Sequence, residues 1–294
     1  MSQATATPVI PTAEPFDRRA RRRPELDPRF LPPILITLIL VGGNASLGML
    51  ESPWKTALAI LTAMLVELGL GRLVVGRWPH LASAYITGIS VGILVRSPFY
   101  WPYALCSALS IASKYAIRYR GRHLFNPSNL GIVAMLFLAP AAVASLSIQW
   151  GNRLLLMLPI WLVGLLVLSR LRRLHITLTY ILAFTVLAGA RSLLIDQPFL
   201  AELAPVTGPM YQLFAMFMVT DPRTTVAGRR GQIGVVLLVA LVECGFRLLQ
   251  VVHAPYYALF LVGPTALIIQ RSRRPSEAPG GESGARLPEA GAAA

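Results

Sequence analysis

Ten apolar segments constrain the fold of this chain more than any other feature of the sequence. A membrane-spanning helix needs about 20 mainly apolar residues, and segments of roughly this kind occur at about 31–50, 54–75, 82–97, 99–117, 128–146, 152–169, 175–195, 208–220, 232–250 and 254–270. Charged residues make up only 14% of the 294 residues, against about 25% in soluble proteins. We therefore predict an all-α membrane protein with ten transmembrane helices, and not a soluble enzyme.

The basic residues predict how these helices are oriented. The chain has 27 Lys and Arg against 13 Asp and Glu, a formal net charge of +14. If the N-terminus is inside, 22 of the 27 basic residues fall on the cytoplasmic side, which is the asymmetry of the positive-inside rule. The charge therefore indicates orientation and not nucleic-acid binding. We expect an integral multi-pass protein of the cell (inner) membrane, with the lipid bilayer as its partner and both termini cytoplasmic.

The organisation along the chain predicts one membrane domain made of two repeats. Residues 1–30 are rich in Pro and Arg and read as a disordered basic cytoplasmic arm, and residues 271–294 read as a disordered tail. Between them, a single transmembrane domain over 31–270 divides into similar halves at about 31–146 and 152–270. Five helices per half would give the two halves opposite orientation. The alternative is a ten-helix chain that merely happens to divide evenly.

The third helix of each half is predicted to be short and broken. Segment 82–97 ends just before Pro98, and segment 208–220 ends just before Asp221-Pro222. The residue before a proline is disfavoured in the helical conformation. Interrupted helices at matching places in inverted repeats indicate a central binding site.

Two polar loops stand out beside the apolar helices, and the predicted topology places both on the cytoplasmic side. In the first, His123 to Gly131, either Asn126 or Ser128 can cap the following helix, and its free N–H groups could hold an anion. The second, Thr220 to Thr225, offers hydroxyls, a carboxylate and a guanidinium within one turn. A plain helix cap and a plain Asp-Pro turn are the simpler interpretations.

Arginines flank both loops. The group consists of Arg118, Arg120, Arg122, Arg223, Arg229 and Arg230. Guanidinium groups this dense can hold a phosphate. Contacts with lipid headgroups are the simpler explanation for basic residues at this level of a membrane.

Few polar side chains lie inside the predicted spans, and ionisable groups at that depth are candidates for function. We predict a proton or ion path through Asn44, Glu67 and Glu243. Glu243 and Arg247 are four residues apart and can pair on one helix face. Glu67 has no evident partner nearby in the sequence, which makes it the stronger candidate for a proton relay, while Lys114 is expected to extend toward the membrane surface.

Three motifs resemble a known family. They are Tyr85-Ile-Thr87-Gly88, the loop Phe125–Gly131, and the segment Phe217–Thr225. They occur in the same order as in the membrane proteins NqrB, of the Na+-translocating NADH:quinone reductase, and RnfD, of the Rnf electron-transport complex. Over about 31–270 the chain looks closest to the stand-alone branch called enediyne biosynthesis protein UnbU.

The resemblance implies a membrane subunit of a flavin-linked electron-transfer system, with electrons passing toward quinone or a redox partner subunit. It places the cofactor contacts at Thr87, Gly88, Arg122, Asn126, Pro127, Asn129, Gly131, Asp221, Arg223, Thr224 and Thr225. The family's redox members attach FMN covalently to the Thr of a Ser-Gly-Ala-Thr type motif. This chain lacks that motif and has no threonine between Gly88 and Ile176. The flavin, FMN or riboflavin, is therefore expected to bind non-covalently.

Two functions of other classes stay open. Inverted repeats with broken helices are also a transporter or channel design, and the basic cytoplasmic face could anchor a soluble partner. Whether the chain is itself an oxidoreductase is left undecided. No metal site is predicted, because Cys106 and Cys244 lack the spacing of a metal or disulfide framework and are expected to be buried apolar groups.

Overall fold

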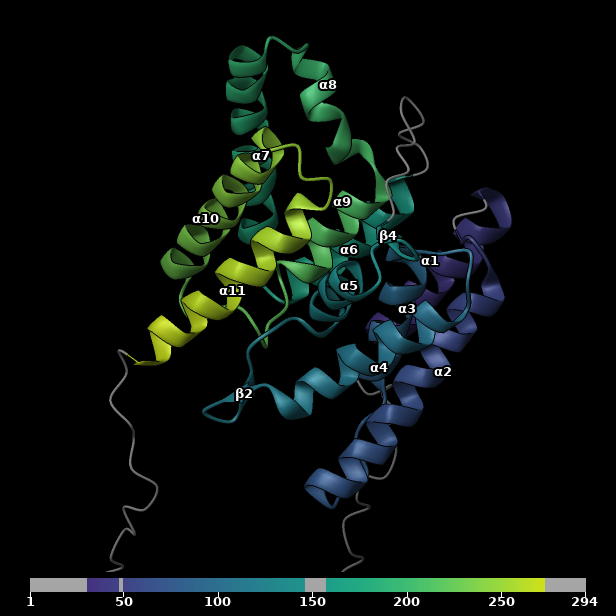
Figure 1. Cartoon of the computed structure of the whole chain (residues 1–294). Coiled ribbons are helices and arrows are strands. Elements are labelled where there is room, and N and C mark those ends of the chain that lie inside the picture. The colour runs from purple at the N-terminus through teal and green to yellow at the C-terminus, as the bar shows by residue number, and fades with distance from the viewer. Residues whose placement is uncertain (1–30, 48–49, 146–156, 273–294) are drawn as a thin grey trace, which may run out of the picture.

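The computed structural model describes residues 31–47, 50–145 and 157–272, and its regular structure there is almost entirely helical (Figure 1). The α-helices are α1 (Leu31–Leu47), α2 (Pro53–Leu70), α3 (Ala82–Leu94), α4 (Trp101–Ala116), α5 (Pro127–Leu138), α6 (Leu158–Arg170), α7 (Leu174–Ile195), α8 (Phe199–Leu203), α9 (Pro209–Leu213), α10 (Arg229–Leu248) and α11 (Ala254–Ser272). Each of the ten predicted segments falls on one of these helices, and the short α8 was not predicted. The arm 1–30 lies outside the described residues, as does the tail beyond Ser272.

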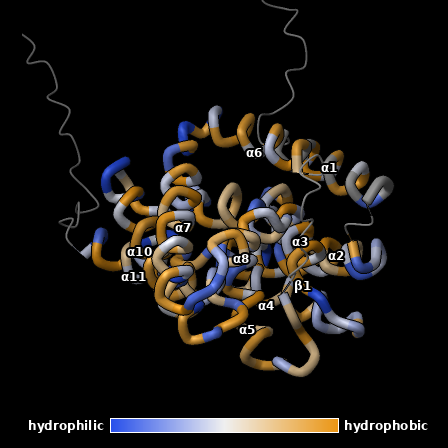
Figure 2. The backbone as a smooth tube through the Cα atoms, turned by 90° about the horizontal axis from the view of Figure 1, so that it is seen from above, coloured by the Kyte–Doolittle hydropathy of each residue, from blue (hydrophilic) through white to orange (hydrophobic). Residues whose placement is uncertain are grey.

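Three of the described helices are long and apolar enough to cross a membrane. They are Pro53–Val75, which is α2 continued by a π-helical turn, and the helices α7 and α10. Large apolar side chains point outward along one side of α7, where Leu182, Val186 and Leu193 are 66%, 71% and 88% exposed. Apolar residues dominate most of the helical tube (Figure 2). An exposed apolar surface of this extent suits lipid better than water.

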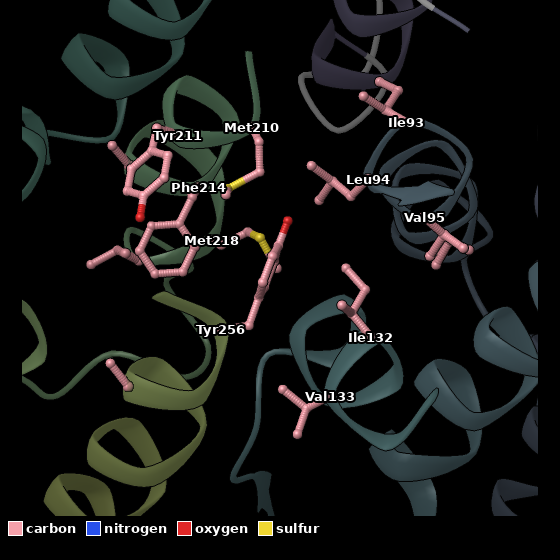
Figure 3. Packing of buried hydrophobic residues seen from close by; sticks show 14 of the residues in the cluster. Ile93, Leu94, Val95, Ile132, Val133, Met210, Tyr211, Phe214, Met218 and Tyr256 are labelled. Atoms are coloured by element: carbon pink, nitrogen blue, oxygen red, sulfur yellow. The ribbon is translucent and has the colours of Figure 1, made fainter. Parts of the chain in front are cut away.

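Part of the helix packing repeats in the two halves of the chain, although α3 packs against α2 and α9 has no such extensive contact with α7. In the first half α2 packs against α4 and α4 against α5, and in the second half α7 packs against α10 and α10 against α11. The halves meet where α5 contacts α11 and where α1 contacts α6. One core spans this junction, with Leu94 and Ile132 on one side and Phe214 and Tyr256 on the other (Figure 3).

The third helix of each half is short, as the prolines predicted. Helix α3 ends at Leu94 and the chain becomes extended in β1 (Val95–Arg96), which pairs antiparallel with β4 (Ala144–Ser145). Helix α9 has five residues and continues as a π-helical segment, Phe214–Met218. The chain therefore leaves regular α-helical geometry after Leu94, four residues before Pro98, and after Leu213, nine residues before Pro222.

A small hairpin leads into the first polar loop. Strand β2 (Arg118–Tyr119) pairs with β3 (Arg122–His123) around Arg120 and Gly121, whose φ angles of 48° and 80° match a type I′ turn. The Arg271 guanidinium donates to the backbone carbonyls of Tyr119 (2.8 Å) and Arg120 (2.7 Å). The end of α11 thus fixes the hairpin that precedes α5.

Candidate functional site at the junction of two polar loops

Asn126 is the cap of α5. Its side-chain Oδ1 accepts the backbone N–H of Asn129 at 3.2 Å and the hydroxyl of Ser128 at 2.9 Å. Pro127 occupies the first turn, where its missing N–H leaves no hydrogen bond unmade. The loop therefore forms a proper helix start, as predicted, with Asn126 in the role that the sequence left open between Asn126 and Ser128.

The second polar loop is held by its own side chains. Asp221 Oδ1 accepts the backbone N–H of Arg223 at 3.1 Å, and Oδ2 accepts the hydroxyl of Thr224 at 2.9 Å. The Thr225 hydroxyl donates to the backbone carbonyl of Asp221. This is the local bonding expected of an Asp-initiated turn, so the carboxylate has a clear structural role.

The fold brings the two loops together, although about a hundred residues separate them. The side-chain amide of Asn126 donates to the Met218 carbonyl at 3.4 Å, and the Arg122 guanidinium donates to the Pro222 carbonyl at 2.9 Å. Between the loops and α10 and α11 lies a small cavity of about 20 Å³, which has room for roughly one water molecule. Its walls are formed by Leu124, Phe125, Asn126, Asn129, Met218, Val219, Thr224, Thr225, Val235, Val236, Val239, Leu259, Gly263 and Pro264.

Asn129 gives this cavity a specific chemical preference. The residue is 1% exposed, and its side-chain Nδ2 donates to the Tyr256 carbonyl at 3.2 Å. Its Oδ1 is buried and has no hydrogen-bond partner among the residues that the structure describes. A buried acceptor left unpaired costs about 1–3 kcal/mol. Asn129 lines the cavity, so a molecule that widened it and carried an N–H or O–H group could satisfy this oxygen.

Positive charge surrounds the Asp221 loop. Burial lowers the pKa of His123, the Asp221 carboxylate opposes this shift, and Arg223 and Lys114 reinforce it. With its pKa below the usual 6.5, the imidazole is mainly neutral at neutral pH. The positive charge beside the cavity therefore comes from arginine and lysine side chains.

A second cavity, of about 50 Å³, lies where the two short helices face each other. Its walls come from α1, α3 and α6 and from the π-helical segment, and Ser90 supplies a hydroxyl among apolar side chains such as Ile93, Leu94, Leu213 and Met218. The sequence predicted a central site at the two broken helices. The structure places a cavity there, and its surface is apolar.

Seven of the eleven predicted cofactor contacts do not line the cavity between the loops; they are Thr87, Gly88, Arg122, Pro127, Gly131, Asp221 and Arg223. A Cβ atom added to Gly88 would lie 2.5 Å from Ile60 Cα, and one added to Gly131 would lie 2.0 Å from Ser110 Oγ. Both glycines therefore allow close packing of neighbouring helices. Thr87 donates its hydroxyl to the Ser83 carbonyl of its own helix at 2.9 Å. Of the predicted contacts, Asn126, Asn129, Thr224 and Thr225 line the cavity.

Glu67 has a partner that its sequence neighbourhood did not reveal. Lys114 Nζ lies 2.5 Å from Glu67 Oε2, and both side chains are buried. The Tyr115 hydroxyl donates to the other carboxylate oxygen at 2.9 Å. The expectation that Lys114 extends toward the membrane surface was wrong, because an inward carboxylate compensates the charge better than a long reach to water. The idea of Glu67 as a partnerless proton relay is corrected in the same way.

Glu243 is paired with Arg247 as predicted, at 3.2 Å. The hydroxyls of Tyr180 and Tyr211 also donate to the carboxylate, each at 2.6 Å. These tyrosines lie 63 and 32 residues before Glu243, so no local pattern could have indicated them. Asn44 bonds instead to the Leu50 N–H at 3.3 Å. The predicted path residues Asn44, Glu67 and Glu243 thus have separate sets of partners in the described part of the chain.

Comparison with known proteins leaves the family open. No protein-family model matches the chain, and no curated protein matches it. The resemblance carried by the three motifs therefore stays a prediction, and the site must be judged on its own geometry.

Proposed function

We propose that the chain spans the inner membrane ten times, as two five-helix repeats of opposite orientation with both termini cytoplasmic. Three observations support this. The ten predicted segments fall on helices, the neighbour order α2–α4–α5 matches α7–α10–α11, and the two short helices occupy corresponding places. In this arrangement both polar loops lie at the cytoplasmic surface.

We further propose that the chain is a membrane subunit of a flavin-linked electron-transfer system. FMN or riboflavin would bind non-covalently at the cavity between the loops, whose walls would move apart to admit the ring because the cavity measures only about 20 Å³. The observation that carries this proposal is the unpaired, buried Oδ1 of Asn129, a residue that lines the cavity. A flavin ring has an N–H group that can donate to this oxygen, carbonyl groups that can accept from the Asn126 amide, and an apolar edge that fits against Phe125 and the valines of α10.

In this function the chain's own groups bind and orient. The flavin supplies the redox chemistry when bound. Asn126 and Asn129 fix the direction of the ring, while Val235, Val236 and Val239 exclude water from its apolar side. The cytoplasmic position of the cavity leaves its opening near a soluble redox partner subunit, and the membrane on the other side can supply quinone.

Filling the cavity tests this proposal directly. The full chain is produced in flavin-replete cells and purified gently in detergent, and the visible spectrum and the flavin released by acid are measured. We expect flavin in the wild type and in Val252→Trp, whose side chain is 77% exposed. Val235→Trp should lose the flavin, because it fills the cavity without removing a hydrogen bond. A wild-type protein without flavin, or equal flavin in both variants, would refute the proposal.

A transporter is the second candidate, and its support is weaker. Inverted repeats with short helices around a central cavity are consistent with it. However, Glu67 is held by Lys114 and Tyr115 and is not a lone carboxylate. Solute or ion uptake into liposomes that is lost in Glu67→Gln, in a protein free of flavin, would favour this function over electron transfer.

A further inference from the structure

Two arginines from opposite halves of the chain donate hydrogen bonds to the same loop, Thr220 to Thr225. Arg122, in β3, donates to the Pro222 carbonyl at 2.9 Å. Arg173, in the turn before α7, donates to the Thr220 carbonyl at 3.2 Å. These carbonyls belong to the residues on either side of Asp221. The two guanidinium groups are therefore fixed on both sides of one short turn, and the exposed Arg223 belongs to the same turn.

The positive charge of these arginines is only partly balanced. Asp221 supplies one negative charge against the three guanidinium groups, and its carboxylate oxygens accept the Arg223 backbone N–H and the Thr224 hydroxyl. Burial lowers the pKa of Arg173, the Asp221 carboxylate raises it, and the charge of Arg122 lowers it again. The two guanidinium groups are thus close enough to repel each other. An additional anion at this place would relieve that repulsion.

We propose that Arg122, Arg173 and Arg223 form a phosphate-binding site at the cytoplasmic surface. A guanidinium carries five N–H donors in a planar fork that suits the oxygens of a phosphate. Arg122 and Arg173 each use one terminal nitrogen on a loop carbonyl, which fixes their position and leaves further donors for a ligand. The site does not depend on a flavin in the cavity.

The other arginines nearby have different positions, and this makes the proposal specific. Arg118 folds back to the Lys114 carbonyl at 2.8 Å. Arg229 and Arg230 are exposed at the start of α10, beyond the loop. Nothing in the sequence favours any one of the six arginines as a phosphate contact. The proposed site uses Arg122 and Arg223 from that group, together with Arg173.

The phosphate can come from an anionic phospholipid or from a soluble compound, and two arms of one experiment distinguish these sources. In the first, the purified full chain is delipidated, offered phosphatidylglycerol, and examined by native mass spectrometry for retained lipid, with phosphatidylcholine as the comparison. In the second, inorganic phosphate is titrated calorimetrically into the protein in a neutral detergent. Both use about 0.3 M salt, where the Debye length is only roughly 6 Å and diffuse attraction is weak.

The test variant is Arg122→Gln/Arg173→Gln, and the matched control is Arg229→Gln/Arg230→Gln, with the same change in charge. Hydrogen bonds to charged groups contribute at least about 1.5 kcal/mol each, so the test variant should bind roughly 100-fold more weakly. The control should bind nearly as the wild type does. If the protein retains phosphatidylglycerol but gives no binding heat with inorganic phosphate, the ligand is a lipid headgroup. If inorganic phosphate binds in the titration, the ligand is a soluble compound.

Arg223→Gln is the control for a folding defect in the test variant, because the Arg223 side chain is exposed and its loss should not destabilise the protein. It should weaken binding while leaving the thermal unfolding of the protein unchanged. The proposal is overturned if the wild type binds neither probe, or if the control variant loses as much affinity as the test variant.

Discussion

The close approach of α2 and α3 at Gly88 gives a sharp test of how this fold is packed. In Gly88→Ala the new methyl group would lie 2.5 Å from Ile60 Cα and 2.9 Å from the Ile60 backbone nitrogen. Ordinary contacts of a Cβ atom begin at 3.4 Å. Because the obstacle is backbone and not a flexible side chain, the two helices must separate by roughly 1 Å.

That separation has a predictable cost. Overpacking of a well-packed interior destabilises by about 1–3 kcal/mol. Alanine is favoured over glycine within a helix by up to about 1 kcal/mol, which offsets part of this loss. For a domain of this size a net loss of about 1–2 kcal/mol lowers Tm by roughly 2–8 °C. Gly234→Ala in α10 is the matched control, because a Cβ there meets no atom within 4 Å. Its Tm should stay the same or rise.

Two buried cysteines of the chain can report its thermal unfolding. Cys106 and Cys244 are free and buried, so a thiol-reactive dye should label them only as the purified protein unfolds on heating. Equal Tm values for Gly88→Ala and Gly234→Ala would refute the packing argument. Loss of flavin from Gly88→Ala at an unchanged Tm would instead support the cofactor contact that the family resemblance implies.

Three further predictions use the same unfolding assay. Lys114→Met should destabilise by roughly 3–5 kcal/mol because it leaves the Glu67 charge buried with only the Tyr115 hydroxyl and no cation. Glu67→Leu added to it should recover much of that loss, and no recovery would contradict the pairing. Asn126→Ala should cost about 1 kcal/mol through the lost cap of α5, so an unchanged Tm would argue against the cap. Because burial lowers the pKa of His123 below 6.5, the unfolded chain binds protons that the folded chain resists, so Tm should fall as the pH drops below about 6.5. His123→Gln should flatten this dependence, leaving the part due to His253, whose pKa burial also lowers; an unchanged slope would exclude His123 as a cause.

The sequence predicted the elements of the fold well and their partners poorly. Apolar length located the helices, and the prolines after Ser97 and Asp221 located the two breaks, because both signals act on neighbouring residues. The cap at Asn126 and the pair Glu243–Arg247 were also readable, since their partners lie within one helical turn. The pairing of Glu67 with Lys114 was missed, because 47 residues separate these side chains.

For the candidate site, the sequence indicated which residues could contact a ligand, and the structure showed which of these residues line the cavity. Asn126, Asn129, Thr224 and Thr225 line one cavity, whereas the glycines at 88 and 131 serve helix packing. A glycine that lets a ligand approach and a glycine that lets a helix approach are identical in sequence. Only the neighbouring atoms distinguish them.

By itself the sequence determined that this chain is helical and apolar enough for a membrane, because hydropathy and proline geometry depend on residues close together along the chain. The tertiary structure decided which distant groups meet: Asn126 with Met218 across 92 residues, and Arg122 and Arg173 on the two sides of Asp221. These contacts depend on how whole helices pack, which is settled by shape and by the need to pair buried polar groups. The ten apolar segments thus form the helices of the fold, and the packing of these helices brings together the residues of the cavity and of the proposed arginine site.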